Sequence, residues 1–84
     1  MPIIARFLGV VVRMFFNDHN PPHLHAEAQQ QEGIYALRDG RRLEGELKTK
    51  DEKNVQAWIA RRRPELLANW ERARQGQPLD QVEE

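Results

Sequence analysis

The sequence contains no cysteine and no long apolar run, and each absence excludes a class of protein. Without cysteine the chain forms no disulfide and no thiolate metal site, a composition that fits a reducing compartment. No segment reaches the ~18 consecutive apolar residues of a membrane span. The apolar residues 7–16 are interrupted by Arg13 and lack the basic start and small-residue cleavage site of a signal peptide. We therefore expect a cytoplasmic protein with no membrane partner.

The chain also lacks an excess of charge of either sign. Its 13 Lys and Arg residues balance its 13 Asp and Glu residues, so the total charge gives no general attraction to nucleic acid. Arginines nevertheless gather beside one predicted turn and at one predicted helix end: Arg38, Arg41, Arg42, Arg61, Arg62 and Arg63. Solvated arginines are the common case at such places, and contact with RNA or DNA is the functional alternative.

The length of 84 residues fits one small domain. A compact chain of this size has a radius of gyration of about 12 Å and little room for a deep internal active site. We expect a single α+β domain over residues 1–76. Residues 77–84 should form an acidic, flexible tail, because chain ends are poorly ordered unless a partner holds them.

The first half of the sequence predicts strands. Residues 3–16 are expected to form one or two strands, with Gly9 as a bend. Residues 23–28 alternate apolar and polar, which is typical of a strand with one buried face, and residues 29–32 form a polar loop. Asp39 and Gly40 predict a two-residue hairpin loop that places Arg38 opposite Arg41. Together these segments predict a mainly antiparallel sheet of three or four strands.

The second half of the sequence predicts two helices. Thr49 and Glu52 fit a capping box at the first helix, Pro64 fits the first residue of a second helix, and Gly76 fits its end. Strands followed by helices predict an α+β fold with both helices packed on one face of the sheet. We expect the following apolar residues to share the core: Val12, Met14, Leu24, Ala26, Ile34, Ala36, Val55, Trp58, Ile59, Leu67 and Trp70.

All three histidines of the chain lie within seven positions, around two consecutive prolines. On an extended strand His23, His25 and Glu27 project from the same face, about 6.5–7 Å apart from one to the next, and the proline corner can fold His19 back towards them. Histidine titrates near neutral pH, so two imidazoles can serve as base and acid. We therefore take His19, His23, His25 and Glu27 as candidate catalytic residues.

Two alternative roles for these histidines stay open. Imidazoles and a carboxylate on one face can hold a zinc-like or iron-like ion. They can also simply hydrogen-bond to the backbone and fix the proline corner. Between a metal site and a structural role we favour the latter, so we expect no metal and no cofactor.

The motif Asn-Asp-His-Asn-Pro-Pro-His-x-His-Ala at residues 17–26 follows an apolar segment that opens Met-Pro-x-Ile. In these features the chain resembles a family of small bacterial proteins known as domain of unknown function 4160. The resemblance continues through residues 43–45, the tryptophan-bearing helical region and the Gly-x-Pro ending at residues 76–78. It implies a role in two-gene modules, often beside another small protein, and in some cases a toxin–antitoxin-like role.

Two functional hypotheses follow. The first is a small regulatory or interaction protein that binds a small protein encoded nearby, as one half of a toxin–antitoxin-like module. The alternative is an enzyme, either a histidine-dependent nuclease or a metal-assisted phosphodiesterase that uses His19, His23 and His25. The developing charge of that reaction needs a cation, which the arginines could supply. The oligomeric state stays open.

Overall fold

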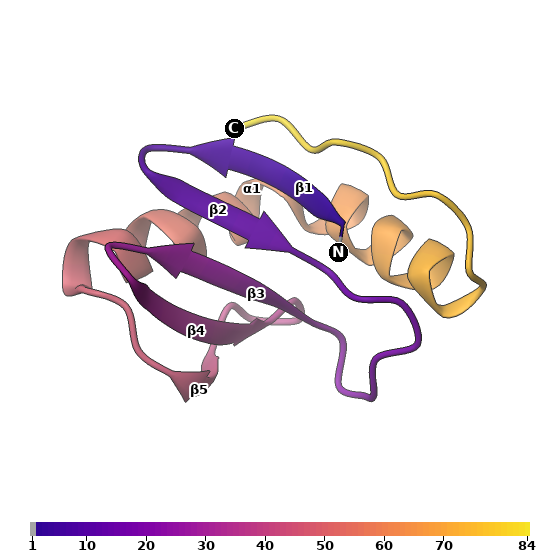
Figure 1. The fold of residues 1–84 in the computed structure, drawn as a ribbon, viewed down its shortest axis with the longest axis horizontal. Helices are drawn as coiled ribbons and strands as arrows, with labels where there is room; N and C mark the ends of the chain where they lie inside the picture. The colour runs from indigo at the N-terminus through magenta and orange to yellow at the C-terminus, as the bar shows by residue number, and fades with distance from the viewer. Residues whose placement is uncertain (1) are drawn as a thin grey trace.

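The computed structural model describes residues 2–84, so Met1 of the predicted domain 1–76 lies outside the described residues. One antiparallel sheet contains the strands β1 (Ile3–Phe7), β2 (Val10–Arg13), β3 (His23–Ala28), β4 (Gln31–Ala36) and β5 (Arg42–Gly45), in chain order. The helix α1 (Thr49–Arg74) follows and covers one face of the sheet, as Figure 1 shows. The α+β class is confirmed, and the radius of gyration is 11.4 Å.

The sheet has five strands, so the prediction of three or four was too low. The tight turn at residues 8–9 accounts for the difference, because it divides residues 3–13 into β1 and β2, and a second tight turn joins β3 to β4. Leu8 and Gly9 have φ of 49° and 80°, and Gln29 and Gln30 have φ of 54° and 66°. Positive φ at both central residues is the geometry that joins neighbouring antiparallel strands most tightly. Only Gly9 belongs to the residue types that favour it, so the turn at residues 29–30 looked like a longer loop in the sequence.

The connection between β4 and β5 is longer than the predicted two-residue loop. Ala36 N donates to Arg41 O at 2.9 Å, and Tyr35 pairs with Arg42, so the predicted pairing of Arg38 with Arg41 is wrong. The reason lies at Leu37, which is fully buried and whose N–H donates to the carbonyl of residue 22 at 3.0 Å. Burial of this side chain ends the strand before the Asp-Gly pair.

A single kinked helix replaces the two predicted helices. The backbone departs from helical geometry at Arg62, with φ −115° and ψ 19°, two residues before Pro64. Proline has no N–H to donate and its ring crowds the carbonyl four residues earlier, so a kink is the expected result. The chain continues as a helix on the other side of the kink, and the break is local.

The two ends of α1 differ in how well the sequence predicted them. Lys48 is the N-cap and makes no side-chain capping hydrogen bond, so the predicted capping box of Thr49 and Glu52 is wrong. At the other end Gly76 has φ 70°, and Gln77 N donates to Arg72 O at 2.8 Å. This 6→1 bond with a left-handed glycine is the Schellman arrangement, and the predicted stop is confirmed.

The core lies between the sheet and α1, and most of the predicted core residues are buried there. Two are not. Ile34 is half-buried on the opposite face of the sheet, and Leu67 is 38% exposed, while its neighbour Leu66 is fully buried. No helix among residues 2–84 is long and apolar enough to cross a membrane.

The last residues run back along the edge of the sheet, beside β1 (Figure 1). Val82 is only 8% exposed, and its N–H donates to Ile4 O at 2.8 Å. Trp58 Nε1 donates to Glu83 O at 2.8 Å. The sequence predicts a flexible tail over residues 77–84, whereas these contacts hold the segment against β1 and α1.

Candidate functional site

The alternation along β3 sends its side chains to two sides of the sheet. Leu24, Ala26 and Ala28 are buried in the core beneath α1. His23 and His25 project from the other side, with ring centroids 5.3 Å apart. His23 is the first residue of β3, at the end of the sheet, and is 5% exposed. His25 lies two residues further along β3 and is half-buried.

Asp18 is the residue on which the histidines converge. Its Oδ2 lies 2.8 Å from His23 Nε2 and 3.4 Å from His25 Nε2, and its Oδ1 lies 3.2 Å from His19 Nδ1. The backbone N–H of His19 also donates to Oδ1 at 2.9 Å, which fixes the carboxylate in the turn before β3. Sequence reasoning missed this residue as part of the site, because Asn and Asp before prolines are typical turn formers.

The other nitrogen of each strand imidazole faces an acceptor. His23 Nδ1 lies 2.7 Å from the carbonyl oxygen of Pro21, which can only accept, so Nδ1 carries a hydrogen and donates it. His25 Nδ1 lies 3.7 Å from Glu32 Oε2. Both rings therefore present Nε2 to the same carboxylate oxygen, that of Asp18.

Asp18 is held in its ionised form. Partial burial pushes the pKa of this carboxyl upward. The hydrogen bond from the His19 backbone, the charge of His23, and the hydrogen bonds from His25 and His23 outweigh that effect. The pKa of Asp18 therefore lies below its ordinary value of 3.8, and the site holds a carboxylate at neutral pH.

Two of the predicted catalytic residues stand apart from this group. The His19 side chain is 89% exposed and its ring centroid lies 5.8 Å from that of His23. Glu27 accepts a 2.7 Å hydrogen bond from Arg13 Nη1, so its charge is neutralised on the neighbouring strand. The structure thus gathers Asp18, His23 and His25, with His19 at the margin and Glu27 outside.

A pocket of about 230 Å³ opens over the histidines and is lined by Asp18, His19, Asn20, Pro21, His23, His25, Ile34, Leu43 and Glu44. None of the six predicted nucleic-acid-binding arginines lines it. Arg63 Nε donates to Leu37 O at 2.8 Å, and Arg62 Nε donates to Glu83 O at 3.1 Å. Arg62 and Arg63 thus link the kinked part of α1 to the rest of the protein. Contact of the six arginines with nucleic acid stays a prediction.

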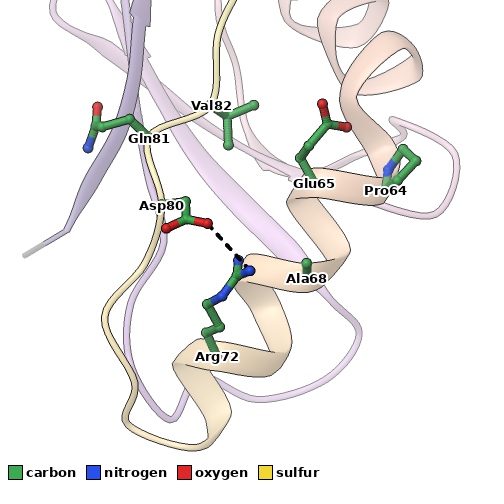
Figure 2. Close-up of a pocket in the computed structure, with 7 residues that line it drawn as sticks. All are labelled: Pro64, Glu65, Ala68, Arg72, Asp80, Gln81 and Val82. Atoms are coloured by element: carbon green, nitrogen blue, oxygen red, sulfur yellow. Dashed lines mark ion pairs between the residues drawn. The ribbon is translucent and has the colours of Figure 1, made fainter.

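A second, larger hollow of about 330 Å³ lies between α1 and the C-terminal segment, far along the chain from the histidines (Figure 2). Its walls include Pro64 and Ala68 of the helix and Val82 of the tail. Arg72 Nη2 lies 3.4 Å from Asp80 Oδ2 across it, as the dashed line in Figure 2 marks. No predicted site residue lines this hollow, and its ion pair helps to hold the tail on the helix.

Comparison with known proteins gives one match. A family model with the description "Domain of unknown function (DUF4160)" matches residues 9–71, which include the β3 histidines, Asp18 and most of α1. No curated protein and no solved structure is significantly similar to the chain.

Proposed function

Since the chain belongs to the DUF4160 family, whose description assigns no activity, we propose from its fold that it is a small interaction protein. In this proposal a partner protein binds across the face of the sheet opposite α1. The partner we expect is the small protein encoded nearby, in a two-gene, toxin–antitoxin-like module. The observation that carries the proposal is the composition of this face.

The face of the sheet opposite α1, which we term the open face, has half-buried apolar side chains on both sides of the polar residues of β3. Val11 on β2 and Ile34 on β4 are half-buried there without a helix above them, and Phe15 packs edge-on against His25 with ring centroids 4.6 Å apart. Figure 1 shows that α1 lies on the other side of the sheet, and its Trp70 reaches His23 only at the end of the sheet. Half-buried apolar side chains on an uncovered sheet face are typical of a surface that binds another protein.

The charges around this centre indicate the chemistry of the partner. Register places Glu32 beside Glu27 and Glu44 beside Ile34, so carboxylates line the β4 and β5 side of the open face. Asp18 adds a further negative charge at the pocket. On the β1 and β2 side of the same face, Arg6 lies beside Val11 and Arg13 pairs with Glu27. A partner with apolar side chains and with basic groups over β4 and β5 complements this face, and a polyanion such as RNA would be repelled by the carboxylates on that side.

Charge reversal on the two faces of the molecule tests the proposal. Glu44→Lys changes an exposed residue of the open face, and Glu71→Lys is the matched control on the exposed side of α1. Each variant is titrated with the purified neighbour-encoded protein by calorimetry. We expect Glu44→Lys to weaken binding at least about tenfold and Glu71→Lys to leave it unchanged. Equal affinities for both variants, or no binding by the wild type, would overturn the proposal.

The enzymatic alternative has one observation in its favour, which is the convergence of His23 and His25 on Asp18 in a pocket. Its weakness is that no arginine lines that pocket to stabilise a developing phosphate charge. The enzymatic alternative would be favoured if the wild-type protein cleaved a single-stranded RNA and the His25→Ala variant did not.

A further inference from the structure

We propose that Asp18, His23 and His25 form a binding site for a divalent transition-metal ion of the Zn²⁺ class. The inference goes beyond the interaction function and does not depend on it, because the site is complete within one chain. It departs from the sequence-based expectation of no metal, and Asp18 is the reason.

The donor atoms lie close enough together for one such ion to bind all three. One carboxylate oxygen and one nitrogen from each imidazole all lie within 4.8 Å of one another. In a tetrahedral shell with bonds of about 2.0–2.1 Å, neighbouring donor atoms stand about 3.3 Å apart. Asp18 Oδ2 lies 2.8 Å from His23 Nε2 and 3.4 Å from His25 Nε2, so the carboxylate oxygen is already near this spacing from each ring, and ion binding would draw the two imidazole nitrogens together by side-chain rotation.

The contacts of His23 require either a proton or a metal ion between its ring and the carboxylate. Because Nδ1 donates to Pro21 O at 2.7 Å, the Nε2 of a neutral ring has a lone pair, and that lone pair faces Asp18 Oδ2. Two lone pairs at this distance repel each other, and an ion that accepts both removes the conflict. A proton on Nε2 is the competing solution, and metal titration separates the two.

His23 also has the outer partner that metal-binding histidines have, and His25 has a carboxylate near the corresponding place. Such a histidine usually donates its second ring N–H to a backbone carbonyl or a carboxylate, which fixes the ring and raises its basicity. His23 has the Pro21 carbonyl in this place, and His25 has Glu32 Oε2 at 3.7 Å from Nδ1.

Packing holds the ligands in place before any ion arrives. His23 is almost fully buried against Trp70, with ring centroids 5.1 Å apart, and Phe15 meets the His25 ring edge-on. Two nitrogen ligands and one oxygen ligand favour Zn²⁺, Co²⁺, Ni²⁺ or Fe²⁺ over Mg²⁺ and Ca²⁺. The fourth position would face the pocket beside Leu43 and Glu44, where water or a donor from a bound molecule can enter.

Calorimetric titration of Zn²⁺ and Co²⁺ into the tag-free, chelator-treated full chain tests the site. We expect one ion per chain, a visible Co²⁺ spectrum with the intensity of a four-coordinate centre, and no binding of Mg²⁺. His25→Ala and Asp18→Asn should each weaken Zn²⁺ binding by about 100-fold or more, since loss of a ligand should cost at least as much as loss of an outer partner. His19→Ala is the matched control and should bind like the wild type, because this exposed ring lies outside the ligand set.

Thermal melts with and without Zn²⁺ distinguish a variant that has lost metal binding from one that is only less stable. Zn²⁺ should raise the Tm of the wild type and of His19→Ala, and leave that of His25→Ala unchanged. No binding by the wild type would overturn the site and leave a protonated His23 paired with Asp18. Binding that survives in His25→Ala, or that is lost equally in His19→Ala, would also overturn it.

Discussion

Replacement of Tyr35 by Phe tests how the sheet is joined to α1. The side chain is fully buried, and its hydroxyl donates a 2.8 Å hydrogen bond to Glu52 Oε1 on the first turn of the helix. Gly33 leaves the room that the ring occupies, because a Cβ there would stand 2.7 Å from it. Tyr35→Phe keeps the ring and removes the hydroxyl alone, so its effect reports on this one bond.

The size of the effect follows from the surroundings of Glu52. A hydrogen bond to a charged group contributes about 1.5–3 kcal/mol. Glu52 is only partly buried, and Arg42 Nη1 lies 3.3 Å from the same oxygen, so the carboxylate keeps a partner after the substitution. We therefore expect the free energy of unfolding at neutral pH to fall by about 1–2 kcal/mol.

The same residue predicts a dependence on pH. Burial, then the hydrogen bond to Glu52 and its negative charge, raise the pKa of Tyr35 far above its ordinary value of 10.0. The folded state thus favours the protonated phenol, and its contribution is complete below about pH 10, the unfolded pKa, and is lost as the pH rises through the folded pKa. The stability difference between wild type and Tyr35→Phe should accordingly shrink as the pH rises above about pH 10.

Urea unfolding followed by tryptophan fluorescence measures both quantities. Equal stability of wild type and Tyr35→Phe at neutral pH would show that the hydroxyl contributes nothing to the contact between β4 and α1. A difference that stays constant up to about pH 11 would refute the raised pKa as its cause.

Three further predictions concern the core, the tail and the arginines. Trp70→Ala should lower the free energy of unfolding by about 3–5 kcal/mol, because the side chain is almost fully buried. A variant that melts at the same temperature as the wild type would contradict the packing of α1. Val82→Ala should cost about 1–2 kcal/mol in the same urea titration, whereas a flexible tail predicts no change. If the predicted arginines bind RNA or DNA, electrophoretic shifts should weaken steeply from low to moderate salt, and no shift at low salt removes that prediction.

Local patterns in the sequence were enough to predict the parts of the fold that local physics decides. The alternation of residues 23–28 predicted β3 with its observed bounds, and Gly76 predicted the end of α1. Where a tertiary contact competes with a local pattern, the tertiary contact determines the structure. Glu52 fits a capping box but accepts a hydrogen bond from Tyr35, and Leu37 fits a strand but is buried in the core.

The candidate site shows the same division. Alternation on an extended strand placed His23 and His25 on one side, as the structure has them. It also placed Glu27 in the same row, but Glu27 forms an ion pair with Arg13 on the neighbouring strand. Asp18 reaches the imidazoles only because the turn folds back over β3, and the direction of a side chain in a turn is not encoded in the spacing of residues.

Mapping of the partner onto the protein by nuclear magnetic resonance tests the central claim most directly. The ¹⁵N-labelled chain is titrated with the small protein encoded beside it, and amide shifts are followed to saturation. We predict changes centred on Val11, His25 and Ile34 of the open face, with the exposed side of α1 around Leu67 unaffected. Changes centred on α1, or none at a saturating concentration of the partner, would contradict this claim.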